Sequence, residues 1–399
     1  MRILVLNSGS SSIKYKLFDM RDRSEVAGGA AERIGGAGSR LVHRDGSGAE
    51  QVDAGAPILD HGEAIDRIAR LLGESGVGAD EEALSGIGHR VVHGGETFRE
   101  PTLIDDRVVS AIRDLSSLAP LHNPANLQGI EVALERRPDL PQVAVFDTAF
   151  HQTIPPHAHR YAIPHEWYES HRVRRYGFHG TSHAYVSRQA AVFLGRPLVE
   201  LNLIVLHLGN GASAAAIEAG RSVDTSMGLT PLEGLVMGTR SGDLDPALIF
   251  HVARESGQSL DDLDAALSGR SGLQGLCGVG DMRDVLAREE AGDERARLAV
   301  EVYTYRIRKY IGAYVAALGH VDAVVFTAGV GENSPEVRER ACRRLGGLGI
   351  EIDPVRNRAA GHAARAIHVE GGAVPVLVVP TNEELEIAEQ TLHCIRNRR

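Results

Sequence analysis

Cysteine and lysine are both scarce in this chain of 399 residues, and each scarcity excludes a class of site. The three cysteines lie far apart and form no CxxC pair, which argues against a disulfide framework and against a thiolate metal site. The only lysines are Lys14, Lys16 and Lys309. None of them follows glycine and precedes serine or threonine, so the sequence contains no Walker A phosphate-binding loop.

Long apolar runs and excess positive charge are missing too. No apolar segment approaches the length of a membrane-spanning helix, and the five apolar residues before Asn7 are too few for a signal peptide. The formal net charge of −10 argues against nucleic acid or an anionic membrane surface as the main partner. We therefore expect a cytoplasmic protein that binds neither nucleic acid nor membranes.

One pattern occurs twice, at residues 2–19 and again at residues 203–218. Each copy is an apolar run rich in β-formers, a turn of small hydrogen-bonding residues, and a second run, which predicts a hairpin with a tight turn. The small residues leave room for backbone N–H groups to surround an anion. Either copy alone is also compatible with an ordinary hairpin. Together they suggest a duplicated fold that holds one polyphosphate from both sides.

Alternating helical and strand patterns run through both halves of the chain. A Gly-rich, polar stretch at residues 33–56 reads as a surface excursion. Three prolines within residues 151–164 mark a domain boundary. We expect an α/β protein with two similar domains and a cleft between them, residues 1–150 with a C-terminal helix at 385–399, and residues 151–384. The helices are expected at 60–72, 108–118, 123–135, 295–318 and from Pro335, and the further strands at 87–95, 142–146, 321–327 and 374–379.

A third candidate phosphate-binding segment follows the strand expected at 321–327. Gly329–Asn333 would place backbone N–H groups and a helix N-terminus at the carboxyl end of that strand, where nucleotides bind in α/β folds. With the two hairpin turns, this completes a set that resembles the actin, Hsp70 and sugar-kinase superfamily. The resemblance implies duplicated domains of the actin or ribonuclease H type.

Six further stretches, spread nearly from end to end, make the resemblance specific, and the chain resembles the acetate kinase (acetokinase) family. The matching stretches are Leu6–Lys14, Phe146–Thr153, Arg175–His183, His207–Ser213, Met237–Asp243 and Thr381–Leu385. The resemblance implies Mg²⁺-dependent, reversible transfer of a phosphoryl group from ATP to acetate, which gives ADP and acetyl phosphate. It also implies a homodimer, and Mn²⁺ as a possible substitute for Mg²⁺.

The resemblance also implies roles for individual residues. Arg90 would bind the carboxylate, Arg240 would clamp the transferring group, and His179 would hydrogen-bond its equatorial oxygens. Asp147 would orient an arginine, or would act as the acid or base that family descriptions name. We favour positioning, because a carboxylate nucleophile carries no proton at pH 7. Around the methyl group of the acid, the family pattern implies Val92, Leu121, Phe178 and Pro231, with His122 nearby.

The family pattern assigns further residues to the nucleotide and to the metal. Asn7 and Glu383 correspond to the Mg²⁺-linked residues, and oxygen donors suit that ion. Lys14 would reach the ATP phosphates. The remaining nucleotide-binding residues would be His207, Leu208, Gly209, Asn210, Gly211, Asp281, Met282, Arg283, Gly329, Val330, Gly331, Glu332 and Asn333.

The segment at 272–281 departs from the family pattern, because it is one residue shorter and has Cys277 and Gly280 where serine is usual. It leaves pyrophosphate open as an alternative phosphoryl donor. Propionate or butyrate remain alternative acceptors, because one methylene changes binding by only about 1–3 kcal/mol. An ATP-dependent chaperone or a filament protein on the shared fold is a rival of another class.

Overall fold

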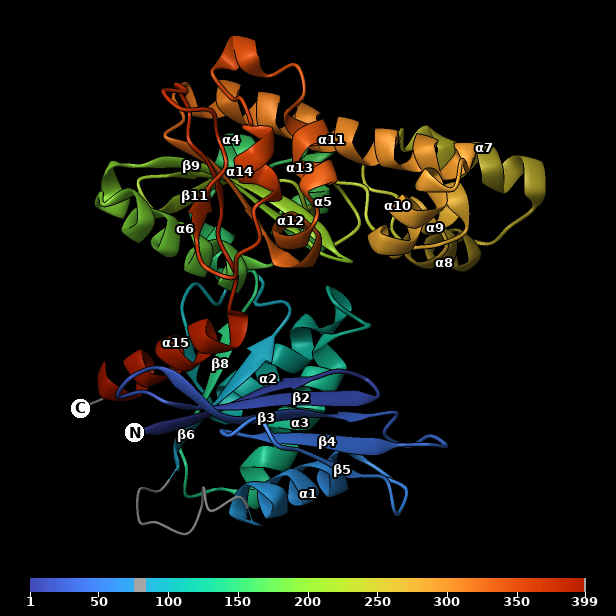
Figure 1. The fold of residues 1–399 in the computed structure, drawn as a ribbon. Helices are drawn as coiled ribbons and strands as arrows, with labels where there is room; N and C mark the ends of the chain where they lie inside the picture. Colours follow the sequence, from blue (N-terminus) through green and yellow to red (C-terminus); the bar gives the residue numbers. More distant parts are fainter. Residues whose placement is uncertain (75–83, 398–399) are drawn as a thin grey trace. The chain divides into compact units, whose positions relative to one another are not determined.

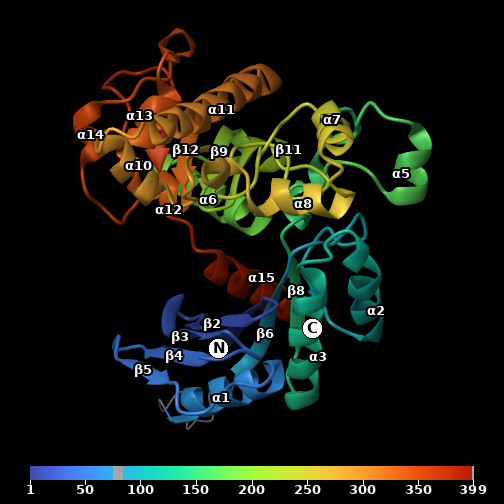
Figure 2. The same ribbon diagram turned by 90° about the vertical axis from the view of Figure 1, so that its right-hand side faces the viewer.

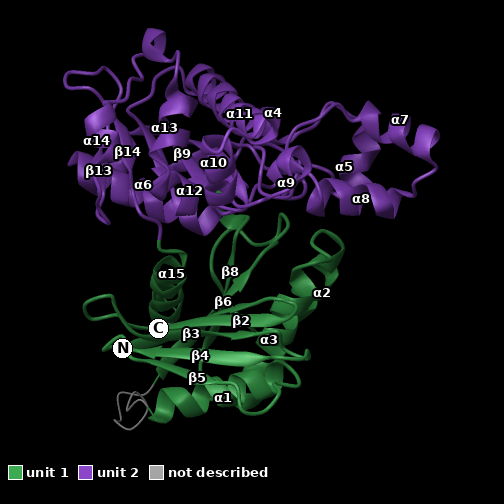
Figure 3. Cartoon of the chain, turned by 45° about the vertical axis from the view of Figure 1, so that its right-hand side comes forward, with its two compact units in different colours: residues 1–150, 382–399 green, residues 151–381 purple. Residues whose placement is uncertain are grey.

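The computed structural model describes residues 1–74 and 84–397, and the chain forms two compact units (Figure 3). Unit 1 comprises the described parts of Met1–Phe150 and Asn382–Arg399, and unit 2 comprises His151–Thr381. The second crossing between units therefore lies three residues before the predicted one at 384/385. Residues 398–399 of the predicted C-terminal helix lie outside the described residues.

Unit 1 is built on a mixed sheet whose order is β5-β4-β3-β2-β1-β6-β8-β7 (Figure 1). Neighbouring strands from β1 to β5 are antiparallel, β6 and β8 run parallel to β1, and β7 is antiparallel to β8. The predicted first hairpin is confirmed, and its turn is closed by the amide of Gly9, which donates to the carbonyl of Ser12 at 2.7 Å. The strands are β1 Arg2–Ser8, β2 Ser12–Asp19, β3 Ser24–Glu32, β4 Arg40–Asp45, β5 Glu50–Asp53, β6 Leu84–Val91, β7 Thr102–Leu103 and β8 Gln142–Phe146.

The prediction of a surface excursion at 33–56 is wrong, because β4 and β5 extend the antiparallel part of the sheet there and form a hairpin. The carboxylate of Asp45 accepts hydrogen bonds from the amides of Ser47 and Ala49 and so holds its tight turn. Leu41 and His43 are buried while their neighbours along the strand are not. Two buried side chains among polar residues are too weak an alternation to recognise in the sequence.

Helices cover both faces of this sheet (Figure 2). Ile87 on β6 belongs to a core that also contains Ile68 of α1 and Ala133 of α3. Its neighbours Gly86 and Gly88 lie directly under α15, so a Cβ atom at Gly88 would be 2.3 Å from the hydroxyl of Thr391. Successive strand residues point to opposite faces, so α15 covers the face opposite α1 and α3. The helices of unit 1 are α1 His61–Glu74, α2 Asp106–Asp114, α3 Asn123–Arg136 and α15 Glu383–Asn397, with a 3₁₀ turn at Leu115–Ser117.

Unit 2 repeats the central topology of unit 1. Its sheet has the order β11-β10-β9-β12-β14-β13, with β9, β12 and β14 parallel and β10 and β11 antiparallel. Five strands of each sheet correspond in order and direction, β3-β2-β1-β6-β8 in unit 1 and β11-β10-β9-β12-β14 in unit 2, which confirms the predicted α/β class and its duplication. The strands are β9 Asn202–Leu208, β10 Ala212–Glu218, β11 Arg221–Thr225, β12 Ala323–Thr327, β13 Arg365–Ala366 and β14 Val376–Val378.

The helices of unit 2 include two short ones in glycine-rich segments for which no helix was predicted. Gly272–Cys277 forms α9 and Ala328–Asn333 forms α12, so the predicted nucleotide-binding segment after β12 is itself a short helix. The predicted start at Pro335 is confirmed, with Ser334 accepting from the amide of Val337. The other helices are α4 Pro156–His159, α5 His165–His171, α6 Gly180–Leu194, α7 Ala247–Ser256, α8 Leu260–Gly269, α10 Met282–Glu290, α11 Glu294–Leu318, α13 Pro335–Cys342 and α14 Pro354–Arg358. None of the helices in the described ranges is long and apolar enough to span a membrane.

Candidate active site

A buried ion pair lies at the carboxyl ends of two adjacent parallel strands in unit 1. Arg90 is on β6, opposite Val145 of β8, and Asp147 directly follows β8. The guanidinium donates from Nε at 3.1 Å to each carboxylate oxygen and from Nη2 at 2.6 Å. The carboxylate side chain is 1 % exposed and the arginine side chain is 24 % exposed. The fork geometry fixes the guanidinium while leaving part of it open to solvent.

The electrostatic surroundings keep Arg90 charged. Burial by itself lowers the pKa of this guanidinium, but Asp147, and then Glu383 and Glu384 on α15, raise it above the ordinary arginine value. Glu383 therefore lies close enough to Arg90 to act on it electrostatically. The predicted carboxylate-binding residue and one of the two predicted Mg²⁺-linked residues thus belong to the same region of unit 1.

Side chains of α3 join the ends of β1 and β6. Asn126 accepts from the amide of Val92 at 3.0 Å and donates to the carbonyl of Ser8 at 2.7 Å. These contacts position Asn7, the other predicted metal-linked residue, which stands across the hairpin from Lys14. Lys14 is exposed, as its predicted role at the ATP phosphates requires.

Two predicted pocket residues of unit 1 differ in environment. Val92 is 8 % exposed, whereas Leu121 is 73 % exposed, so the described part of unit 1 covers little of its side chain. The sequence pattern gave both residues the same expected role. The described part of unit 1 therefore forms no closed apolar pocket around this pair.

In unit 2, His179 precedes α6 with φ at 56°, a left-handed conformation that is uncommon for residues other than glycine. Its ring stacks on His207 with the centroids 4.2 Å apart. A Cβ atom at Gly211 would be 3.5 Å from Nε2 of His179 and 3.3 Å from Nη2 of Arg240. The predicted catalytic residues His179 and Arg240 thus converge on the turn between β9 and β10.

Arg240 differs from Arg90 because no acidic side chain in the described residues pairs with it. Its Nη1 donates to the carbonyl of Pro231 at 2.8 Å, and burial lowers the pKa of the guanidinium. Phe178, a predicted pocket residue, is 2 % exposed, and its carbonyl lies 3.0 Å from Nε2 of His151. Unit 2 therefore presents a cation without a protein counter-charge next to a rigid turn.

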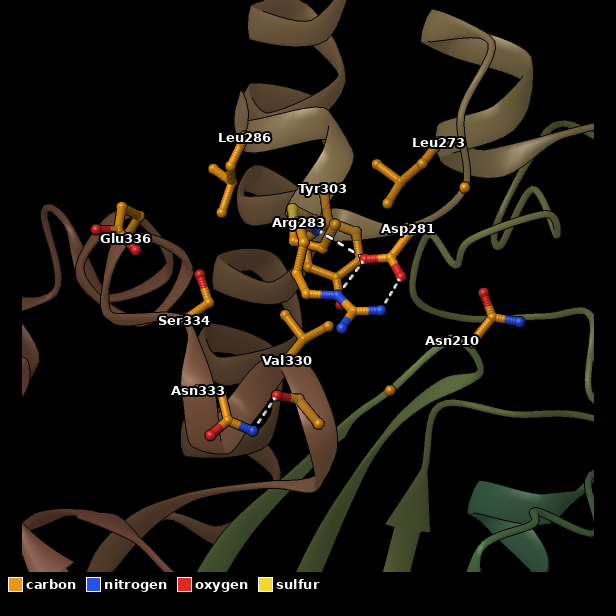
Figure 4. A pocket seen from close by; sticks show the side chains of 14 residues that line it. Asn210, Leu273, Asp281, Arg283, Leu286, Tyr303, Val330, Asn333, Ser334 and Glu336 are labelled. Carbon is orange, nitrogen blue, oxygen red and sulfur yellow. Dashed lines mark hydrogen bonds and ion pairs between the residues drawn. The ribbon is translucent and has the colours of Figure 1, made fainter. Parts of the chain in front are cut away.

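A pocket of about 590 Å³ within unit 2 collects most of the predicted nucleotide-binding residues (Figure 4). It lies between the β9–β10 turn, α10, α11 and α12. Asp281 accepts from Nη2 of Arg283 at 2.6 Å, and Nδ2 of Asn333 donates to the carbonyl of Gly329 at 2.8 Å. The lining residues are Gly209, Asn210, Leu273, Gly280, Asp281, Met282, Arg283, Leu286, Tyr303, Gly329, Val330, Asn333, Ser334 and Glu336.

Five predicted nucleotide-binding residues of unit 2 do not line this pocket, namely His207, Leu208, Gly211, Gly331 and Glu332. The carboxylate of Glu332 instead accepts from the amides of Ala328 at 2.8 Å and Thr381 at 3.1 Å. It therefore satisfies one backbone donor at the start of α12 and one in the segment between β14 and α15. The ring of His207 stacks on His179.

Comparison with known proteins assigns the chain to a family. The sequence model of the acetokinase family matches residues 2–389. The chain is 59 % identical to acetate kinase from Streptomyces coelicolor, over 98 % of this chain and 96 % of that protein. The chain belongs to the acetokinase family. Its members are kinases with ATP as a substrate, so this chain is a kinase as well.

Solved structures support the same assignment. The crystal structure of Porphyromonas gingivalis acetate kinase is similar to this acetokinase with a TM-score of 0.94 and 42 % identity, over 99 % of both chains. A propionate kinase from Francisella tularensis has a TM-score of 0.92 and 41 % identity, over 98 % of this chain and 99 % of that one. The chain thus resembles relatives that are named for two different acids.

The sequence did not reveal the role of Arg338, a buried residue that holds α12 beside the pocket of this acetokinase. Arg338 is 1 % exposed and donates from Nη1 to the carbonyls of Gly331 and Glu332, both at 2.9 Å, and from Nε to Asn357 at 2.8 Å. Burial, and then the charge of Arg365, lower its pKa to about 10. Arg338 ties α12 to α13, but nothing in the sequence distinguishes it from the surface arginines around it.

Proposed function

We propose that this acetokinase transfers the γ-phosphoryl group of ATP to acetate, reversibly and directly, forming acetyl phosphate and ADP. An acetate oxygen forms the new bond to phosphorus while the bond between phosphorus and the ADP oxygen breaks. The electron pair of the broken bond stays on the ADP oxygen. The observation that carries the proposal is Arg240, a guanidinium beside His179 and the β9–β10 turn that pairs with no carboxylate of the described residues. Phosphoryl transfer needs such a charge, because negative charge spreads over the equatorial oxygens in the transition state.

The proposed roles follow from the two environments of arginine. Arg90 binds the acetate carboxylate, and Asp147 holds Arg90 in place. Both oxygens of Asp147 already accept hydrogen bonds from Arg90, and the attacking carboxylate has no proton to lose. These contacts favour positioning over acid–base catalysis. Arg240 and His179 neutralise and orient the transferring group, with Val92, Leu121, Phe178 and Pro231 assigned to the methyl group.

The donor roles are distributed over both units. The pocket between α10 and α12 receives the adenosine, with Asp281, Met282 and Arg283 on one side and Gly329 and Val330 on the other. The turns after β1 and β9 receive the phosphates, with Lys14 from the first and the segment 207–211 from the second. Pyrophosphate as donor would leave this pocket without a role, so we favour a nucleotide.

Asn7 and Glu383 are the residues assigned to a Mg²⁺ ion. An amide and a carboxylate oxygen suit a hard cation that keeps several waters, and Glu383 is near Arg90 in unit 1. No group of three or more His, Cys, Asp or Glu side chains in the described residues could hold a metal, which fits an ion held largely by water and phosphate. When bound, the ion neutralises phosphate charge.

We also propose that the protein is cytoplasmic and forms a homodimer. Sedimentation of the purified protein tests the homodimer.

A hydroxamate assay with acetate, ATP and Mg²⁺ tests the reaction. Arg240→Ala should lower kcat by roughly 10³-fold or more, the range of an arginine that stabilises phosphoryl transfer. Arg196→Ala is the matched control, because that arginine pairs with Asp322 at 2.6 Å on the surface of unit 2 and should turn over normally. Wild-type protein that forms no acetyl hydroxamate above a blank would reject the function. Normal turnover in Arg240→Ala would remove that residue from the mechanism.

Propionate is the second candidate acceptor, because one of the similar structures is a propionate kinase. We favour acetate, since the relative from Streptomyces coelicolor and the structure from Porphyromonas gingivalis are acetate kinases. One additional methylene is worth about 10–200-fold in kcat/KM. A series of acetate, propionate and butyrate, each with ATP and with pyrophosphate, decides both acceptor and donor. ATP hydrolysis that does not depend on any acid would instead favour a chaperone or filament protein.

A further inference from the structure

A buried serine connects two histidines behind the site in unit 2. Oγ of Ser213, on β10, lies 2.9 Å from Nδ1 of His179 and 2.8 Å from Nε2 of His183 on α6. Ser213 and His183 are both 0 % exposed, whereas His179 is half-buried. None of the sequence motifs assigned a role to Ser213 or His183, and the proposed reaction does not use them directly.

The single hydroxyl proton limits how these three groups can bond. A serine hydroxyl donates once, so it can donate to only one of the two ring nitrogens, and the other nitrogen must donate to it. If both rings donated to the oxygen, the buried hydroxyl proton would be unpaired among the described residues, which is costly. Two arrangements use that proton. Either His183 donates to Ser213 and Ser213 donates to His179, or both bonds run in the opposite direction.

The surroundings of His183 distinguish the two arrangements. Burial lowers the pKa of His183 well below its usual value, and the nearby rings of His151 and His207 lower it further, so the imidazole is neutral and carries one N–H. Its Nδ1 is buried and has no hydrogen-bond partner among the described residues. If Nδ1 carried the proton, a buried donor would be unpaired, which is rarer and costlier than an unused acceptor lone pair. The proton therefore belongs on Nε2.

The direction of the whole chain follows. His183 Nε2–H donates to Ser213, and the Ser213 hydroxyl donates to Nδ1 of His179. We propose that Ser213 and His183 are positioning residues that hold neutral His179 in the tautomer with its proton on Nε2. That nitrogen lies beside Gly211, next to Nη2 of Arg240. One part of this proposal rests on the proposed function, namely that the oxygens of the transferring phosphoryl group accept the hydrogen bond from this N–H.

This arrangement would give the enzyme an N–H group that donates a hydrogen bond to phosphate while the histidine stays neutral. A free histidine offers an Nε2–H only in part of its neutral population, and an imidazolium is lost as the pH rises. Among the described residues, the rings of His151 and His207 lie near His183, and Arg240 lies beside Nε2 of His179. A fixed neutral tautomer therefore keeps its hydrogen bond to an anion at neutral and mildly basic pH.

Nitrogen-15 NMR of protein labelled at histidine tests the tautomer in the resting enzyme. The His179 signals, assigned by their loss in His179→Asn, should show a bare Nδ1 and a protonated Nε2 at pH 7.5. In Ser213→Ala they should move toward the average of two tautomers. Ser187→Ala is the matched control, because Ser187 is equally buried on α6 but bonds only to the carbonyl of Ala184, and it should leave the signals unchanged. A protonated Nδ1 in the wild-type protein would overturn the proposal.

Two replacements of His183 provide a kinetic test that separates its role in orienting His179 from its contribution to stability. His183→Leu should lower kcat by roughly ten- to a hundredfold, the range found for hydrogen-bond partners that orient metal-ligating histidines, with the KM of acetate nearly unchanged. His183→Gln returns an N–H near the position of Nε2 and should recover most of kcat at a similar melting temperature. Equal losses in both folded variants would contradict the proposal. If wild-type protein made no acetyl phosphate, the proposed function would fail, while the tautomer would still be decided by the spectra.

Discussion

At the scale of single residues, Arg90 in unit 1 and Arg240 in unit 2 have opposite surroundings. Arg90 is held by a buried carboxylate, and Arg240 by a carbonyl alone. Removing one partner of a buried ion pair leaves an uncompensated charge, whereas removing an unpaired arginine does not. Loss of Arg90 should therefore affect stability as well as turnover, and loss of Arg240 should affect mainly turnover.

We predict that Arg90→Ala lowers the free energy of unfolding by about 3–5 kcal/mol, because the Asp147 carboxylate stays buried without its partner. Arg90→Ala combined with Asp147→Ala should be more stable than Arg90→Ala alone. Urea denaturation of the two variants and the wild type measures the difference. If Arg90→Ala unfolds at the wild-type urea concentration, the pair contributes nothing to stability.

The family resemblance singled out Arg90, Asp147, His179 and Arg240, and the last three stand in stretches that match the family. It could not show what touches those residues. The exposure of Leu121 depends on chain distant in sequence, as does the burial of Arg338. For these residues, environment rather than residue type decides the role.

At the scale of elements, close contact between α3 and β1 depends on one glycine. A Cβ atom at Gly129 would be 2.1 Å from Oγ of Ser8, which follows the predicted metal-linked Asn7. Gly312, in the middle of α11, has no heavy atom within 4 Å of the same position. Adding a methyl group at these two helical glycines should therefore change the stability of the protein in opposite directions.

We predict that Gly129→Ala destabilises the protein by about 1–3 kcal/mol through overpacking. Gly312→Ala should stabilise it by up to about 1 kcal/mol, because alanine favours the helix. Thermal unfolding of both variants provides the comparison. Adding Ser8→Gly to Gly129→Ala should restore part of the loss, and no recovery would place the strain elsewhere.

Elements with strong local signals were predicted within a few residues, such as the two hairpins, α3, α11 and β8. The errors fell where a short segment depends on its partners. Strands β4 and β5 need the β3 edge, and the short helices α9 and α12 are formed in segments that read as glycine-rich loops. Glycine content predicts freedom of the backbone but not the conformation that packing selects.

At the scale of the whole molecule, three buried histidines link stability to pH. Burial lowers the pKa of His89 and of His151 to about 4, and it lowers that of His183 in the same direction. Unfolding returns each ring to water, where its pKa is near 6.5. The unfolded chain therefore binds more protons than the folded chain between pH 6.5 and pH 4.

We predict that stability is constant above about pH 6.5 with respect to these groups and is lost as the pH falls toward 4. Each histidine contributes about 1.4 kcal/mol per pH unit in that window. His89→Gln, which can keep the hydrogen bond to Gln142, should reduce the slope by one such increment. Urea unfolding at pH 7.5 and pH 5 measures both proteins, and an unchanged slope would show that His89 is already protonated in the fold.

The path of the chain has a consequence for biosynthesis. The strands of unit 1 are translated early, but α15, which closes over the glycines of β6, follows all of unit 2 in the sequence. On the ribosome, that sheet keeps one apolar face uncovered until residues beyond 380 have left the exit tunnel. The final folding step of unit 1 therefore follows the synthesis of unit 2, as domain-by-domain folding of a long chain allows.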